Sequence, residues 1–130
     1  MKRAKPVIFA VFFIILLSLT TVAANDIELV VKKVEKVSDD EFSVQYYVIN
    51  RKNFDRYNVT IGFKIFDDGV PVGCKRIKTT IPKDSDESDI KEAKIKISGE
   101  GKNLDFKANI FYLTKQYRVD EWFSDCPDSE

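Results

Sequence analysis

The sequence YNVTIGFKI, residues 57–65, decides the fold of this chain, because it carries an apolar side chain at every second position. Between these side chains stand Asn58, Thr60 and Lys64, which are polar or charged. Strict alternation of this kind predicts a β-strand with one face in a core and the other face toward solvent. The core face is expected to consist of Tyr57, Val59, Ile61, Phe63 and Ile65.

This strand runs into two adjacent carboxylates and a glycine, Asp67–Gly69, before a second apolar run begins. A calcium loop of the EF-hand kind would need oxygen ligands at positions 1, 3 and 5 before the glycine and a glutamate at position 12. Lys64 and Phe66 stand at the first two of these positions, and Lys75 stands at the last. We therefore expect a hairpin turn, which Asp-Gly favours because both residues tolerate positive φ angles.

Other segments alternate in the same way and are separated by turn-forming residues. The first run changes parity between Val31 and Val34, which predicts a bulge or a crossing between sheets. Residues 93–97 also fit a helix, but their β-branched content and short length favour a strand. The spacing predicts an all-β fold, an immunoglobulin-like antiparallel β-sandwich of about seven strands. The runs lie near residues 27–34, 41–50, 57–65, 93–97 and 104–112 and after Gly69, with a further strand expected at residues 116–123.

The N-terminus has the pattern of a secretory signal, which divides the chain into a signal peptide (residues 1–24) and one sandwich domain (residues 25–130). A positive start is followed by the apolar run VIFAVFFIILL and then by small residues. Val22 and Ala24 suit the two positions that signal peptidase recognises. We therefore expect export, to the outside of the cell or to its envelope, with Asn25 as the first residue of the mature protein.

An uncleaved membrane anchor is the alternative. Residues 7–24 carry no charge and are just long enough to span a bilayer as a helix. In that case the protein would contact the membrane through this segment alone.

The charge and composition of residues 25–130 exclude several functions. The signal holds three of the 21 basic residues and none of the 21 acidic ones, which leaves a net charge of about −3. No basic patch dominates, so nucleic acid is not an expected partner. The chain has no histidine, which removes Ser-His-Asp and Cys-His nucleophile pairs and imidazole metal sites. We expect no enzyme, no metal and no cofactor.

The chain has two cysteines, Cys74 and Cys126, and both lie in the part expected to be exported. An oxidising compartment favours a disulfide between them. A two-cysteine metal site is the alternative, but it lacks further soft ligands. A bridge would tie the C-terminal segment, with Trp122 and Phe123, to the middle of the sandwich, and we expect Trp122 to be mostly buried there.

The order of these motifs resembles the immunoglobulin-like modules of prokaryotic envelope proteins, of which CARDB-type and FxLYD-type domains are the nearest. The segments DIELVVKKV, VQYYVIN and NVTIGFKIFDDGVPVG carry the resemblance, which covers residues 26–113. IPKDSDESD stands where these modules usually have L-x-P-G-E-S. The resemblance implies a non-catalytic binding or spacer module and transfers no site residue. The matching positions are Asn50, Asp68, Gly69, Val72 and Gly73.

Three surface features are candidate sites. The acidic stretch Asp84–Asp89 offers oxygens that hard cations bind, although such runs are commonly solvated loops. Asn58 begins an Asn-Val-Thr triplet, which is an acceptor for an N-linked glycan. Tyr47, Phe66 and Phe111 have the parity opposite to the core and form a candidate partner surface, unless the C-terminal segment folds over them.

These features predict a secreted or envelope-associated module that binds or spaces without catalysis. Its partner would be a protein or another envelope component of unknown identity. The alternative is a secreted enzyme inhibitor that presents a surface loop, for which residues 50–57 and 83–89 are the candidates. A cluster of exposed aromatic side chains would favour the binding module. A protruding ordered loop would favour the inhibitor, and a deep polar cleft would favour an enzyme.

Overall fold

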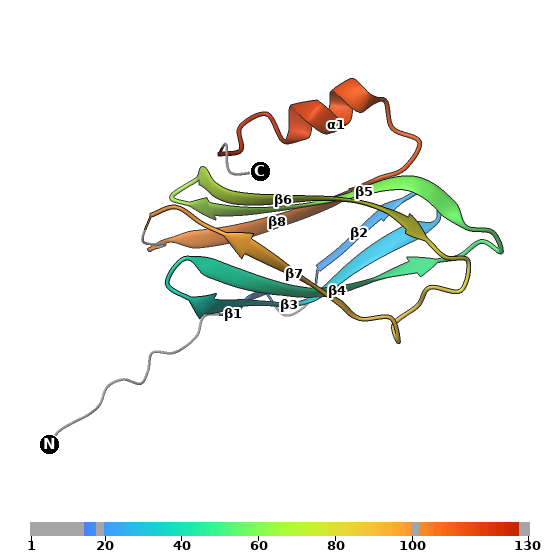
Figure 1. The fold of residues 1–130 in the computed structure, drawn as a ribbon, viewed down its shortest axis with the longest axis horizontal. Coiled ribbons are helices and arrows are strands. Elements are labelled where there is room, and N and C mark those ends of the chain that lie inside the picture. The colour runs from blue at the N-terminus through green and yellow to red at the C-terminus, as the bar shows by residue number, and fades with distance from the viewer. Residues whose placement is uncertain (1–14, 18–19, 100–101, 128–130) are drawn as a thin grey trace, which may run out of the picture.

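The computed structural model describes residues 15–17, 20–99 and 102–127. Two antiparallel sheets pack face to face, and a short helix lies on the outer side of one of them (Figure 1). The predicted all-β sandwich is therefore confirmed. The elements are β1 (Ile15–Leu17), β2 (Thr20–Ala24), β3 (Ile27–Ser38), β4 (Glu41–Asn50), β5 (Arg56–Asp67), β6 (Val70–Ile81), β7 (Lys91–Lys96), β8 (Leu104–Phe111) and α1 (Gln116–Trp122).

The strand order is that of an immunoglobulin-like sandwich. One sheet has the order β3-β4-β7, and β1 and β2 both pair with β3 along its outer edge. The other sheet has the order β6-β5-β8. These orders correspond to strands A, B and E and to strands C′, C and F of immunoglobulin domains. In those domains strand F leads into strand G, whereas here β8 leads into α1.

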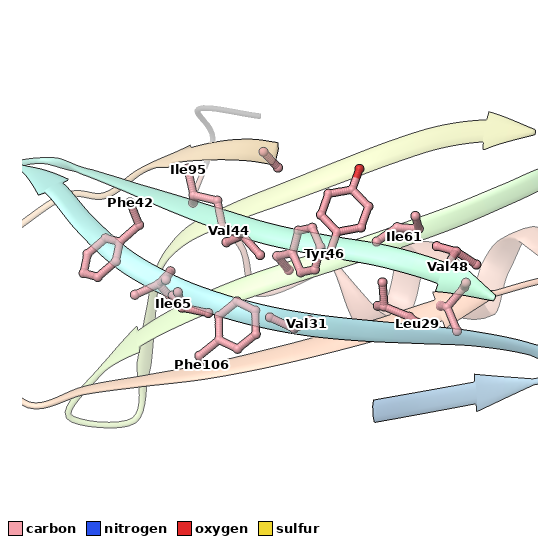
Figure 2. Packing of buried hydrophobic residues seen from close by; sticks show 14 of the residues in the cluster. Leu29, Val31, Phe42, Val44, Tyr46, Val48, Ile61, Ile65, Ile95 and Phe106 are labelled. Atoms are coloured by element: carbon pink, nitrogen blue, oxygen red, sulfur yellow. The ribbon is translucent and has the colours of Figure 1, made fainter. Parts of the chain in front are cut away.

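The core lies between the two sheets and is built from the residues that the alternation placed inward (Figure 2). The ring of Tyr46 lies edge-on to Phe63, with 5.3 Å between the ring centroids, and Phe63 stacks on Phe106 at 5.8 Å. Residues 93–97 form strand β7 with its short continuation and not a helix, and Ala93 and Ile95 are buried. Alternation therefore located the core correctly on most strands.

Two expected irregularities are also present. Asp68 and Gly69 have φ angles of 53° and 80° and form the two-residue turn between β5 and β6. Both angles are positive, as a tight hairpin turn with the sheet's twist requires. The register of β3 against β4 shifts between Val31 and Lys33, which is the bulge that the change of parity indicated.

The inward position predicted for Tyr57 is wrong, because its side chain is 62% exposed. Asn58 has a φ angle of 57°, and the register of β5 against β6 shifts between Arg56 and Val59. This β-bulge inserts one residue, so the alternation before Val59 is reversed. Arg56 is buried in place of Tyr57.

The strand expected at residues 116–123 is also wrong, because this segment forms α1 and its C-terminal end. Val119 and Phe123 are buried, and their spacing of four residues places them on one face of the helix. The helix lies on the outer side of the sheet β6-β5-β8, as Figure 1 shows, and Phe123 contacts Phe111 and Arg76 of that sheet. Trp122 is half-buried, so its predicted burial is only partly met.

Strand β5 is consequently covered on both sides. All residues from Val59 to Ile65 are buried, including Thr60 and Lys64, whose side chains point away from the core. The ammonium of Lys64 lies 2.8 Å from a carboxylate oxygen of Asp125 and 4.3 Å from the ring of Trp122. The hydrogen bond from Lys64 lowers the pKa of Asp125, so this ion pair persists at neutral pH and is lost as the pH falls through that lowered pKa.

A disulfide fixes the end of the helix to the neighbouring strand. Cys74 of β6 is bonded to Cys126, with 6.0 Å between the Cα atoms, and this confirms the predicted pairing. It is not the inter-sheet bridge of antibody domains, because it joins an outer covering segment to one sheet. Arg76 adds a contact beside it, since its guanidinium lies 4.3 Å from the ring of Phe123 and bonds Asp120.

Gly62 provides the space that the helix needs. A Cβ atom at this position would lie 2.5 Å from Cζ3 of Trp122 and 2.6 Å from Cζ of Phe123. Real Cβ atoms do not approach other atoms so closely, so any larger residue would displace the two rings. The glycine in the middle of a strand is thus explained by close packing.

The predicted signal peptide falls largely outside the described residues. Positions 1–14 and 18–19 are not described, whereas positions 15–17 and 20–24 form β1 and β2. No helix among the described residues is long and apolar enough to cross a membrane. The signal and its cleavage therefore stay predictions.

Replacing Cys74 and Cys126 by alanine should lower the free energy of unfolding. For cysteines 52 positions apart, the chain-entropy model gives a loss of about 4 kcal/mol, because the unfolded chain regains the freedom that the loop removed. Urea unfolding followed by the fluorescence of Trp122 measures the change. An unchanged midpoint in the double variant would show that the covering segment is held without the bridge.

Gly62→Ala should destabilise the packing of α1 by about 1–3 kcal/mol, because the added methyl group overlaps two rings. A double-mutant cycle with Trp122→Ala provides the control, since removing one ring should reduce the cost of the methyl group. Unfolding in urea, followed by circular dichroism, gives the four free energies. Additive costs would mean that Gly62 and Trp122 do not touch.

Candidate functional site

A cleft lies where the bulge of β5 meets the start of α1. We call it the bulge cleft, and it has a volume of about 420 Å³. Its walls come from β5, β6, the end of β8 with the connection that follows, and α1. The lining residues are Tyr57, Asn58, Thr60, Lys78, Phe111, Tyr112, Leu113, Thr114, Gln116 and Val119.

Two lining residues hold backbone conformations that L-residues rarely adopt. Asn58 has a φ angle of 57°, and Leu113 has one of 60°. Asparagine tolerates the left-handed region because its short side chain can bond locally, but leucine does so at a cost of about 1–2 kcal/mol. Strain of this kind persists where the surroundings over-determine it and is concentrated at functional sites. Both strained residues lie on the same cleft.

Large side chains around the bulge cleft stay open to solvent. Leu113 is 79% exposed, and Tyr57, which lines the same cleft, is 62% exposed. Tyr117 is exposed at the first turn of α1, next to the lining residue Gln116. Solvent-exposed aromatic and aliphatic side chains that gather in one place are typical of a binding surface.

A buried guanidinium supports this end of the sandwich. Arg56 is only 3% exposed, and its guanidinium lies between the rings of Phe54 (4.7 Å) and Tyr112 (4.9 Å). It donates a hydrogen bond of 2.9 Å to the carbonyl of Asn25, while its Nε has no partner among the described residues. The two aromatic contacts offset part of the cost of burying the charge.

The electrostatics of the bulge cleft are simple. Lys78 is the one described residue of the Lys, Arg, Asp and Glu types that lines it. Asp120 does not line the cleft, but it bonds the lining residue Gln116; this hydrogen bond, another from Arg76 and the nearby positive charge of Lys78 lower its pKa. This carboxylate therefore stays ionised at neutral pH and offers no proton to a bound molecule.

The candidate partner surface predicted from three outward aromatics does not form. Tyr47 belongs to β4 and lies on the outer face of one sheet, whereas Phe66 and Phe111 belong to β5 and β8 of the other sheet. Phe66 sits near the hairpin at the far end of β5, with the ammonium of Lys107 5.3 Å from its ring. The three residues share the parity opposite to the core, but parity does not indicate which sheet a strand joins.

The alternative prediction for these aromatics is that the C-terminal segment folds over them. This is true of Phe111 but not of Tyr47. The ring of Phe111 lies 5.9 Å from Trp122 and 6.4 Å from Phe123, so the C-terminal segment does fold over it. Tyr47 pairs across the strands with Val30 on the other side of the molecule, which α1 does not reach. Truncating the tail should therefore expose Phe111 and leave Tyr47 unchanged.

The acidic stretch Asp84–Asp89 has a structural explanation. Asp86 accepts hydrogen bonds from the backbone nitrogen and hydroxyl of Ser88, at 2.9 and 2.7 Å, and these bonds lower its pKa. Ser85 is buried and donates to the carbonyl of Val48 at 2.6 Å, which fastens the loop to β4. Among the described residues no group of three potential metal ligands comes together.

The glycosylation acceptor Asn58 is exposed on the bulge. Because this residue also lines the bulge cleft, a glycan there would cover the cleft. Glycan attachment itself stays a prediction.

The sequence pattern does not predict the cleft, because the cleft depends on the left-handed backbones of Asn58 and Leu113. Asn58 is a residue type that tolerates positive φ, and this was the one signal of the bulge in the sequence. Val119, Trp122 and Phe123 have helical spacing, and reading them at a period of 3.6 would have predicted α1. Nothing in the sequence around Leu113 indicates its left-handed backbone.

Comparisons with protein families, with curated proteins and with solved structures give no match for this chain. The function is therefore inferred from the geometry of the molecule itself. The bulge cleft brings together the exposed aromatics, the strained residues and the amide and hydroxyl groups that a ligand could contact.

Leu113→Gly should raise the free energy of unfolding by about 1 kcal/mol, because glycine adopts a positive φ without strain. Leu113→Ala is the matched control, since it removes the same exposed side chain but keeps the strained backbone. Urea unfolding of both variants measures the difference. A glycine variant that is no more stable than the alanine variant would show that Leu113 stores no strain.

Proposed function

We propose that this chain is an exported, non-catalytic binding module that takes a protein or another envelope component at the bulge cleft. The observation that carries the proposal is the position of Tyr57 and Leu113. Both side chains are large and mostly exposed, and both line the same cleft. An exposed apolar side chain contributes to binding when a partner removes it from water.

The backbone around these two side chains supports the same proposal. Tyr57 is exposed only because the bulge at Asn58 reverses the alternation of β5. Leu113 is presented by a strained residue that glycine would occupy without cost. An arrangement that gives up stability to expose apolar side chains is expected where those side chains have a role.

The chemistry of the lining favours binding over catalysis. The described lining residues include amides, hydroxyls, aromatic rings and one lysine, and none of them is a carboxylate or a cysteine. The whole sequence has no histidine. A nucleophile with an adjacent base, or a pair of carboxylates around a bond, therefore has no representative at the cleft.

An inhibitor that presents a loop is less well supported. Asn50 is buried, and its side-chain nitrogen donates to the carbonyls of Phe54 and Pro82 at 2.9 and 3.1 Å. The backbone nitrogen of Lys83 donates to Asp55 at 2.9 Å. The two candidate loops are thus tied to each other at one end of the sandwich, and neither stands out alone.

Export is supported by the disulfide and by the N-terminal pattern. The chain has a disulfide, Cys74–Cys126. Disulfides persist in oxidising compartments and are rare in reducing ones. The resemblance to CARDB-type and FxLYD-type modules agrees with a binding or spacing role, and its motif residues serve architecture. Asn50 fastens the loops, and a Cβ at Gly73 would lie 2.5 Å from the carbonyl oxygen of Lys96.

Binding of the labelled, processed protein to an envelope fraction from its own organism tests the proposal. Tyr57→Ser combined with Leu113→Ser should lower the bound fraction at least tenfold, because two central apolar contacts are lost. Val70→Ser combined with Ile90→Ser is the matched control, since these two side chains are also exposed but do not line the cleft. Circular dichroism confirms that all forms are folded.

The same assay distinguishes the kind of partner. If binding disappears after the envelope fraction is digested with protease, the partner is a protein; if it survives, it is another component. An unmodified domain that binds nothing would indicate a spacer and overturn the proposal. Equal loss in the cleft variant and in the control variant would place the binding surface elsewhere.

A further inference from the structure

The outer edge of β3 carries a strand that the predicted processing would remove. Thr20–Ala24 form β2, which pairs antiparallel with Ile27–Val31 through a two-residue turn at Asn25 and Asp26. Val22 and Ala24 are partly buried against the core of the sandwich. The edge of β3 is thus able to accept an extended strand whose alternate side chains are small and apolar.

Both fates predicted for the N-terminus take β2 away from this edge. Cleavage before Asn25 removes it from the chain. In the anchored form, the uncharged run at positions 7–24 must cross the bilayer, and it is only just long enough. Without the five residues of β2 the run keeps 13 positions, 7–19, which is too short for a spanning helix. The strand and the anchor therefore exclude each other.

The edge of β3 stays in place when β2 is gone, because its first residues are held by other parts of the domain. The side chain of Asn25 donates to the carbonyl of Tyr112 at 3.0 Å, and the carbonyl of Asn25 accepts from Arg56. The carbonyl of Asp26 accepts from the backbone nitrogen of Arg51 at 3.1 Å. None of these bonds involves β2, so processing leaves an ordered edge with unpaired backbone groups.

From these observations we propose that the β3 edge of the processed domain binds an extended peptide strand of a partner, antiparallel, at Ile27–Val31. The partner strand has small aliphatic side chains at alternate positions, which fill the places of Val22 and Ala24. Its backbone replaces the hydrogen bonds that β2 makes, as in other cases of strand addition to an exposed sheet edge. This surface is distinct from the bulge cleft, and the proposal rests on the predicted removal of β2.

A second copy of the domain is a poorer occupant. Its own β3 would have to lie beside the first, but Ile27, Leu29 and Val31 are fully buried in the core of their own domain. These side chains cannot also fill the places left by Val22 and Ala24 in the other molecule. The side chains of a free peptide strand are not already buried in a core, so those on one face can fill these places.

The experiment uses the full chain, expressed with its own N-terminal segment and purified after export. N-terminal sequencing first establishes where the mature protein begins. A synthetic peptide, KTTVAAK, that contains residues 20–24 is then added at millimolar concentration, and amide hydrogen exchange is followed residue by residue. We expect the exchange of amides in Ile27–Val31 to slow at least tenfold, while amides of β5 do not change. The control peptide KTTKAKK carries lysine at both inward positions and should have no effect, because an ammonium cannot enter the apolar places.

Each other outcome overturns the proposal. A mature protein that begins before Thr20 and is released from the membrane would keep β2, and the edge would already be filled. Equal protection by both peptides would show an edge that does not select side chains, and protection by neither would show an edge that binds no strand. Protection that depends on protein concentration without peptide, together with a dimer in sedimentation, would make a second copy the occupant. None of these results depends on the bulge cleft, so failure here is separable from failure of envelope binding.

Discussion

The covering of β5 on both faces is the constraint on which the rest of this structure depends. Its inward side chains form the centre of the core, and its outward side, with Gly62 and Lys64, is buried under α1. Without the helix the ring of Phe111 would face water. The Cys74–Cys126 bridge and the ion pair to Asp125 keep this cover in place.

The same cover also creates the candidate site. Four residues, 112–115, connect β8 to α1, and one of them, Leu113, adopts a left-handed backbone. The bulge at Asn58 and this turn both line the bulge cleft. Stability gained by burying the outer face of β5 thus allows two strained residues to persist. Binding at the cleft would be sensitive to anything that loosens the helix.

The N-terminal and C-terminal segments cover the two sheets in different ways. At the C-terminus a helix replaces the strand that would follow β8 in an immunoglobulin domain, and a disulfide makes this cover permanent. At the N-terminus the strand β2 covers the edge of β3, but it is held by strand pairing and partial burial alone. The predicted cleavage before Asn25 would remove β2 and leave unpaired backbone groups on β3, which favour the addition of a new strand.

Alternation by itself determined the sandwich, most of its core and the Asp68-Gly69 turn, because a strand's period of two fixes which side chains share a face. The sequence has two cysteines, and the expectation of an oxidising compartment predicted the pairing of Cys74 with Cys126. Tertiary structure decided that Tyr57 is exposed, that Tyr47 and Phe111 lie on different sheets, and that residues 116–122 form a helix. The bulge cleft was likewise decided there, because one inserted residue and one left-handed turn depend on packing between distant segments, and local sequence carries almost no record of either.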